Sequence, residues 1–97
     1  MSITGGAMLS RPILIGSAIW DELDSFDKNL KSKFIRAFRF LSRDISHPSL
    51  QVELVKSADT RFYRARVDPG CRFHFYRLES HYLILSIGPH RLLGIGK

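Results

Sequence analysis

Two runs of alternating basic and apolar residues, joined by Asp68-Pro69-Gly70, constrain the fold of this chain most strongly. Side chains in a β-strand point alternately to its two faces, and a Pro-Gly pair favours a tight turn. The pattern therefore predicts a hairpin with strands at Phe62 to Val67 and Cys71 to Leu78. Its first face would carry Arg64, Arg66, Arg72, His74 and Tyr76, and its second face Tyr63, Ala65, Val67, Phe73 and Phe75.

The charge of the first face indicates what it meets. Burying several unpaired charges is costly, so we expect this face to stay open and to bind an anionic partner. The composition agrees, because fifteen Lys and Arg outweigh nine Asp and Glu and leave a net charge of +6. Such a balance favours polyanions but does not distinguish RNA, DNA, an acidic protein or an anionic membrane.

The length and the single cysteine limit the class of protein. Ninety-seven residues suffice for one small core, so we expect a flexible leader at residues 1–11 and one domain at residues 12–97. Cys71 stands alone, which excludes an intrachain disulfide and a cysteine-based zinc site and favours a reducing, cytoplasmic setting. The apolar runs Pro12 to Ile15 and Tyr82 to Ile87 are too short to cross a bilayer, so no membrane partner is expected.

Apolar residues at helical spacing precede the hairpin. A short helix is expected from Ser17, and a longer one capped by Ser25 or Asp27. The residue before a proline disfavours helical geometry, so His47-Pro48 is expected to end the second helix. Its buried stripe would contain Leu30, Phe34, Ala37 or Phe38, Leu41 and Ile45.

Three further segments have strand character: Pro12 to Ile15, Leu50 to Val55, and Tyr82 to Ile87. Together with the hairpin they predict an α+β fold, in which two N-terminal helices pack on an antiparallel sheet of three to four strands.

Three features of this order are similar to the RelE/ParE superfamily of toxin–antitoxin toxins, over about Ile13 to His90. The first is the helical pair running into His47-Pro48-Ser49-Leu50, followed by Glu53-Leu54. The second is Tyr63-Arg64-Ala65-Arg66-Val67, a turn, and Arg72 opening the next strand. The third is the terminal apolar strand ending in Ile87-Gly88-Pro89-His90, which resembles the family's closing motif. The resemblance implies a RelE-like fold.

The resemblance also implies an activity and partners. Many members are ribosome-dependent endoribonucleases that cut mRNA without a metal or cofactor, and an antitoxin protein wraps and neutralises the toxin. The implied partners are therefore a cognate antitoxin, the ribosome and mRNA. Two alternatives remain open: a ParE-like, non-catalytic inhibitor of DNA gyrase, and an inactive relative that binds only an antitoxin or nucleic acid. The second is favoured by the residues after His90, which lack the tyrosine of several relatives.

Metal-free RNA cleavage needs a phosphate-stabilising group, and arginine suits it because its planar fork donates to phosphate oxygens and keeps its charge. Arg72, at the family's strand-opening arginine, is the first candidate; the alternative is a surface arginine paired with Asp68 or Glu79. Arg64 and Arg66 match the family's paired basic positions and would hold the RNA backbone or the scissile phosphate, which makes Arg64 a catalytic candidate as well. Their alternative role is to keep the face soluble.

Proton transfer and base binding have their own candidates. His90 is the first candidate for a general acid or base, because an unperturbed histidine titrates near neutral pH; its alternative is a satisfied surface group after a Gly-Pro turn. His74 is the second, since it is expected on the face of Arg72. Glu53 would act as a base or hold an arginine in position, and a structural ion pair is its alternative. Tyr76 would stack on an RNA base, or pack at an edge.

A metal site is not expected. The chain has four histidines, but their spacing matches no familiar ligand pattern. His47 is interpreted as part of a helix end and His81 as a turn residue.

Overall fold

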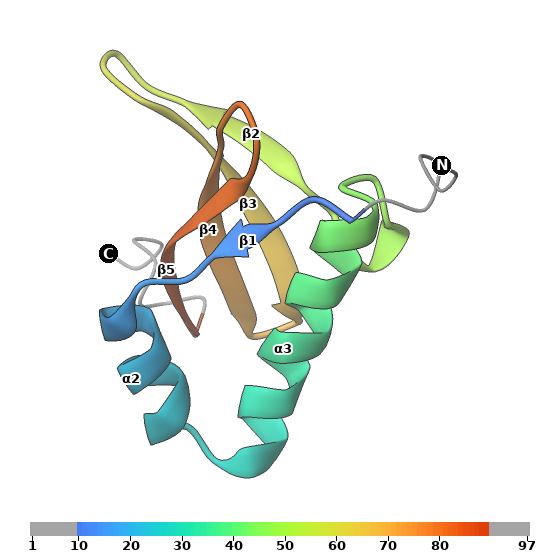
Figure 1. The fold of residues 1–97 in the computed structure, drawn as a ribbon, viewed down its shortest axis with the longest axis vertical. Helices are drawn as coiled ribbons and strands as arrows, with labels where there is room; N and C mark the ends of the chain where they lie inside the picture. Colours follow the sequence, from blue (N-terminus) through green and yellow to red (C-terminus); the bar gives the residue numbers. More distant parts are fainter. Residues whose placement is uncertain (1–9, 90–97) are drawn as a thin grey trace.

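The computed structural model describes residues 10–89, which form two α-helices, one 3₁₀ helix and five strands. Figure 1 shows these elements in the order β1, Ile13–Leu14; α2, Ser17–Ser25; α3, Lys28–Arg43; η1, Pro48–Leu50; β2, Glu53–Lys56; β3, Arg61–Asp68; β4, Cys71–Arg77; and β5, Tyr82–Pro89. The predicted order of elements is therefore present, with boundaries shifted by one to three residues at most of the strands.

The strands form one sheet in the order β1-β5-β4-β3-β2. Strands β2 to β5 are an antiparallel meander, and β1 lies parallel to β5 with Ile13 opposite Tyr82 and Leu14 opposite Leu83. The predicted antiparallel sheet of three to four strands is thus wrong in count and in kind, because the sheet is mixed and has five strands. The parallel pair is two residues long and joins distant parts of the chain, so local periodicity carries little signal for it.

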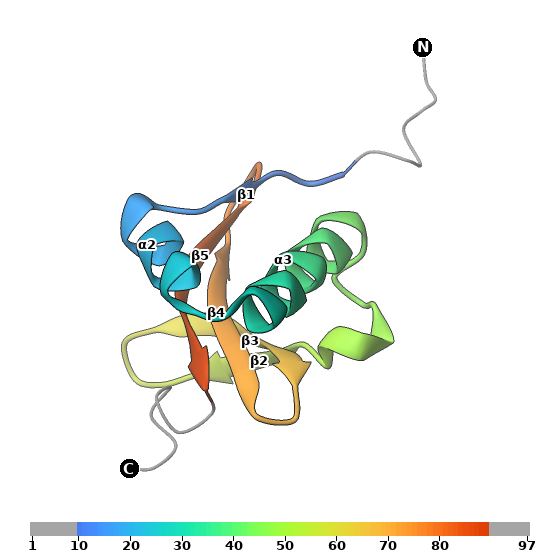
Figure 2. The same cartoon turned by 90° about the horizontal axis from the view of Figure 1, so that it is seen from below.

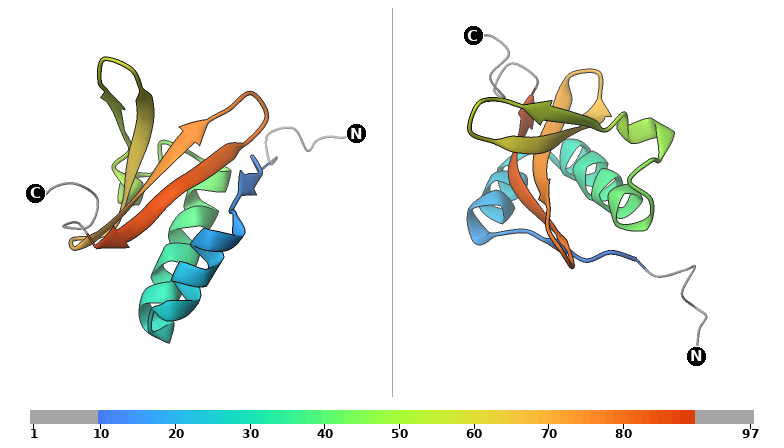
Figure 3. Two further views of the ribbon diagram at one scale, coloured as in Figure 1. Left: turned by 90° about the vertical axis from the view of Figure 1, so that its left-hand side faces the viewer. Right: turned by 90° about the horizontal axis from the view of Figure 1, so that it is seen from above.

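Both α-helices lie on one side of the sheet (Figure 3, left). Asp27 is the residue that caps α3: its Oδ1 accepts a hydrogen bond from the Leu30 N–H at 2.8 Å. This side chain satisfies one of the free amides at the start of the helix. The expected stripe faces the core, with Phe34, Ala37, Phe38 and Leu41 buried and Leu30 half-buried.

The end of α3 differs from the prediction. The helix stops at Arg43, so Ile45 lies outside it and His47-Pro48 does not end it. Asp44 accounts for the earlier stop, because its Oδ1 accepts from the Ser46 N–H and hydroxyl and so stabilises a turn in place of a further helical residue. Pro48 instead opens η1, a position where its missing N–H costs nothing.

Aromatic residues dominate the core between the sheet and the helices. Phe73 and Phe75 of β4 are fully buried, as is Ala65 of β3. Phe38 of α3 meets Phe73 edge to face with ring centroids 4.9 Å apart, and Tyr82 meets Phe75 in the same way at 5.3 Å. These contacts confirm the predicted apolar face of the hairpin, and they leave the alternate side chains on the opposite face of the sheet.

The segment before β1 is tied to two other elements. Arg11, the last residue of the expected leader, donates its N–H to the Ser42 carbonyl at 2.7 Å, and its Nη2 donates to the Leu78 carbonyl. Its guanidinium lies 4.8 Å from the centre of the Tyr82 ring. Seen from below, the segment that precedes β1 passes beside the turn that joins β4 to β5 (Figure 2).

Candidate functional site

The basic face is built from cross-strand rows of side chains. Glu53 on β2 lies opposite Arg64 on β3, Arg64 opposite His74 on β4, and His74 opposite Ser86 on β5. Opposite residues in an antiparallel pair share a face, so these four side chains form one row across the sheet. Arg64, His74 and Ser86 are half-buried, whereas Glu53 is exposed.

A second row lies beside the first. Arg66 on β3 faces Arg72 on β4, and Arg72 faces Gly88 on β5. Both arginines are half-buried. Gly88 has a φ of 153°, a conformation that favours glycine, and it places no side chain opposite Arg72. The sheet therefore brings Arg64, Arg66 and Arg72 together, as the sequence predicted.

Glu53 holds Arg64. Its Oε2 accepts from Arg64 Nε at 3.2 Å and from Arg64 Nη2 at 3.1 Å, while the second carboxylate oxygen is left to other partners. The Arg64 side chain is 23% exposed and that of Glu53 is 53% exposed. Of the two functional roles considered for Glu53, the geometry matches that of a residue that positions an arginine.

Gln51 holds Arg66 by a hydrogen bond. The sequence did not mark Gln51 as a residue of the site. Its Oε1 accepts from Arg66 Nη1 at 3.1 Å. Gln51 has φ 45° and ψ 52°, the left-handed conformation that is uncommon for a residue with a side chain. This turn redirects the chain from η1 into β2. No residue pattern marks a glutamine for that conformation, and its proximity to Arg66 depends on the sheet register.

The surroundings of His74 favour its neutral form. Burial lowers the pKa of His74, and the nearby positive charge of Arg64 lowers it further. The ring lies 4.7 Å from that of Phe62, and within residues 10–89 its Nε2 has no hydrogen-bond partner. A neutral imidazole can accept a proton, and His74 lies opposite Arg64, one row from Arg72.

Tyr76 is half-buried and continues the face toward the far end of β4, opposite Leu83. It lines a shallow hollow of about 450 Å³ together with Arg61, Arg77, Leu78 and Tyr63, a residue of the apolar face. Aromatic and arginine side chains in one depression suit a stacked base beside a phosphate. Base stacking by Tyr76 stays a prediction.

A bulge in β3 removes the acidic residue of the turn from the basic face. The register shifts between Arg66 and Asp68, so that Asp68 lies opposite the buried Cys71 on the helix side of the sheet. There it forms an ion pair with Lys33 of α3 at 3.3 Å. Partial burial raises the pKa of Asp68, but hydrogen bonds from the Gly70 N–H and from Lys33 outweigh it, so the net shift is downward.

Other expectations concern metals, membranes and His90. Among residues 10–89 no group of three His, Cys, Asp or Glu side chains comes together where it could hold a metal ion. In the same range, no helix has both the length and the hydropathy needed to cross a membrane.

Burial and Asp68 raise the pKa of the Cys71 thiol, which keeps it protonated and poorly nucleophilic. His90 lies outside the described residues.

Comparison with known proteins identifies the fold. Neither a protein-family profile nor a curated protein sequence matches the chain. Solved structures do match. A chain of the archaeal RelE–RelB complex from Pyrococcus horikoshii OT3 is 18% identical, with a TM-score of 0.69 over 84% of this chain and 96% of that one. A chain of the YoeB–YefM complex from Staphylococcus aureus is 19% identical, with a TM-score of 0.67 over 82% and 97%. The YoeB/ParE toxin from Agrobacterium tumefaciens is 15% identical, with a TM-score of 0.65 over 81% and 98%.

Proposed function

The chain has the fold of the RelE/ParE toxin superfamily, and from this premise we propose that it is the toxin of a type II toxin–antitoxin system. We further propose that it acts in the cytoplasm as a metal-independent endoribonuclease on mRNA bound to the ribosome. The fold alone does not choose this activity over inhibition of DNA gyrase. The arrangement of the basic face supports it.

The observation that carries this proposal is the pair of adjacent rows Glu53–Arg64–His74 and Arg66–Arg72. Three guanidinium groups on one half-buried face would bind and stabilise a phosphate, because arginine donates several hydrogen bonds without losing its charge. Two of them are already oriented by Glu53 and Gln51. A face that only kept the protein soluble would not need its arginines fixed from the neighbouring segments.

The proposed reaction is an internal transfer within RNA. The ribose 2′-oxygen attacks the neighbouring phosphorus while a base takes the hydroxyl proton, and the bond from phosphorus to the 5′-oxygen breaks. An acid then donates a proton to that leaving oxygen. The products are a 2′,3′-cyclic phosphate and a 5′-hydroxyl, and no redox partner or metal is consumed.

Each task has a proposed residue. Arg72 would stabilise the charge that develops on the phosphate, a task for which one aimed donor contributes on the order of 3–4 kcal/mol. Arg64 and Arg66 would grip the RNA backbone on either side. His90 would be the first proton-transfer group and His74 the second, since the lowered pKa of His74 favours its neutral form and His74 lies in the row of Arg64. Glu53 would position Arg64.

We also propose an antitoxin partner that covers the helical side. A hollow of about 240 Å³ between β1, α2 and α3 is lined by Ile13, Ile15, Trp20, Ile35, Phe38, Arg39 and Ser42. Trp20 is 40% exposed, although large aromatic side chains usually gain by burial. Arg39 also lines an adjoining basic depression on α3. An amphipathic segment with acidic flanks fits both features.

The deciding experiment incubates the purified chain with mRNA in the presence and absence of translating ribosomes, and maps the cuts by primer extension. The proposal expects cuts only with ribosomes. A parallel gyrase supercoiling assay tests the alternative: inhibition of supercoiling without any RNA cut would contradict the nuclease proposal and favour a ParE-like toxin. Inactivity in both assays, with no growth arrest on expression, would favour the inactive relative.

A further inference from the structure

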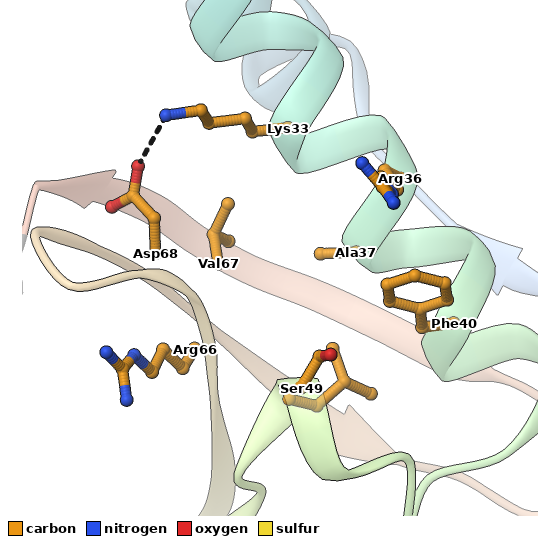
Figure 4. Close-up of a pocket in the computed structure, with 9 residues that line it drawn as sticks. Lys33, Arg36, Ala37, Phe40, Ser49, Arg66, Val67 and Asp68 are labelled. Atoms are coloured by element: carbon orange, nitrogen blue, oxygen red, sulfur yellow. Dashed lines mark hydrogen bonds and ion pairs between the residues drawn. The ribbon is translucent and has the colours of Figure 1, made fainter.

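A further cationic hollow lies between α3, η1 and the C-terminal end of β3. It has a volume of about 270 Å³ and is lined by parts of α3, η1 and β3. Figure 4 shows its polar residues, which are Lys33 and Arg36 from α3, Ser49 from η1, and Arg66 and Asp68 from β3. Ala37, Phe40, Leu50 and Val67 form the apolar part of the lining.

The charge in this hollow is suited to an anion. Lys33, Arg36 and Arg66 supply three positive charges, and Asp68 offsets one of them through its ion pair with Lys33 at 3.3 Å. The Lys33 side chain is 48% exposed and that of Asp68 is 23% exposed, so the ammonium faces solvent and an incoming anion can share it. The Ser49 hydroxyl adds a donor of the kind that phosphate oxygens accept.

Arg66 connects this hollow with the basic face. It faces Arg72 in the sheet register, and it also lines the hollow. Its Nη1 is bound to Gln51, which leaves the other guanidinium N–H groups of Arg66 for further partners. An RNA strand whose scissile phosphate lies between Arg66 and Arg72 would therefore pass next to the hollow.

We propose that this hollow is a second phosphate-binding site, which takes a phosphodiester of the same RNA strand beyond the cleaved one. The inference rests on the proposed function for the identity of the strand. The phosphate chemistry rests on Lys33, Arg36, Ser49 and Arg66 alone. The site would set the register of the RNA and add affinity without taking part in bond breaking.

The test is a titration of the isotope-labelled full chain, followed through its backbone amide signals. One arm uses inorganic phosphate, a second a 2′-O-methylated RNA trinucleotide that cannot be cleaved, and a third a short poly-glutamate peptide. We expect saturable shifts at residues 33–37, 49 and 66–68 with phosphate and with the trinucleotide. Shifts at these residues with the peptide alone would overturn the proposal. The absence of shifts in all three titrations would also overturn it.

Charge-matched variants make the test specific. K33A/R36A removes two cations from the hollow, whereas K28A/R39A removes two from the adjoining depression on α3, which Arg36 also lines, and leaves the lining of the hollow intact. Log affinity for the trinucleotide falls linearly with log salt. In K33A/R36A this negative slope should become shallower by about 0.7, the change expected when one phosphate contact on a single strand is lost. K33R/R36K keeps both charges and should have the same salt dependence as the wild type. Equal slopes for K33A/R36A and K28A/R39A would contradict the site.

The two proposals can fail separately. Arg72→Ala lies outside the hollow, so this variant should keep the amide shifts even when cleavage is lost. If the hollow binds phosphate and the trinucleotide but the protein never cuts mRNA, the nuclease proposal is refuted and the phosphate-binding site still stands. Ribosome-dependent cutting with no shift at these amides would refute the site and leave the nuclease.

Discussion

Arg64 donates from Nε and Nη2 to a single oxygen of Glu53, at 3.2 and 3.1 Å, across the β2–β3 pair. This geometry fixes the plane of the guanidinium and leaves its Nη1 side for an incoming phosphate. Glu53 therefore acts on RNA through Arg64 in the proposed reaction. The relationship leads to a prediction that separates a positioning role from a role as base.

Glu53→Gln should change stability little and slow cleavage. Exposed ion pairs contribute about 0–1 kcal/mol, so the free energy of unfolding should fall by no more than that. Single-turnover cleavage on ribosomes should slow about tenfold, which corresponds to about 1.4 kcal/mol of lost phosphate stabilisation. The pH–rate profile of the Glu53→Gln variant should have the same shape as that of the wild type. Loss of the acidic limb would show instead that Glu53 accepts the proton.

Asp24→Asn is the matched control for that variant. It breaks the ion pair between Lys31 of α3 and Asp24 of α2, whose atoms lie 2.5 Å apart and whose side chains are more exposed than those of Arg64 and Glu53. Cleavage should be unchanged. If Asp24→Asn slowed cleavage as much as Glu53→Gln, the effect would reflect general charge rather than the hold on Arg64.

Gln51→Gly should be more stable than Gln51→Ala by about 1–2 kcal/mol, measured by chemical denaturation. Both variants lose the hydrogen bond to Arg66, so they differ only in the cost of the left-handed backbone at φ 45°. A β-carbon disfavours that conformation by about this amount, and glycine adopts it freely. Equal stabilities would contradict the left-handed turn between η1 and β2.

His74 should make the folded state less stable in mild acid. Its native pKa lies below the unfolded value near 6.5, so the unfolded chain binds a proton first as the pH falls. Its contribution is thus fully present above pH 6.5 and is lost between that value and the lower native pKa. The drop in unfolding free energy from pH 7.5 to 5.5 should be smaller in His74→Gln.

Asp27→Ala should destabilise the chain by about 1 kcal/mol, because it removes the cap of α3. Ser25→Ala should cost less, since the Ser25 hydroxyl donates to the Glu22 carbonyl in the last turn of α2 and caps no helix N-terminus. Thermal unfolding measures both. Neither residue lies on the basic face, so ribosome-dependent cleavage at a temperature where both remain folded should match that of the wild type.

The hairpin was predictable because its two faces differ at every second residue. Ala65, Phe73 and Phe75 are buried, and Arg64, Arg66 and Arg72 share the other face in register. The helices were likewise predictable in type, since Phe34, Phe38 and Leu41 recur at helical spacing. These features depend on local alternation or periodicity, which a single sequence displays directly.

The missed features depend on contacts between distant segments. The β3 bulge turns Asp68 away from the arginines and toward Lys33, a residue that the helical pattern does not distinguish from its solvent-facing neighbours. Gln51 reaches Arg66 only because of its left-handed backbone. The two-residue β1 pairs with β5, about 70 positions later in the chain. None of these leaves a periodic signal.

The most direct test of the central claim compares wild type with Arg72→Ala and Arg72→Lys in ribosome-dependent cleavage of mRNA under single-turnover conditions. Loss of one aimed donor should slow the Arg72→Ala reaction by about 10²–10³. Arg72→Lys should recover only part of the rate, because an ammonium lacks the planar fork. The amide spectra of all three proteins should show the same fold. Undiminished cleavage by a folded Arg72→Ala protein would contradict the claim that this sheet face is the phosphate centre.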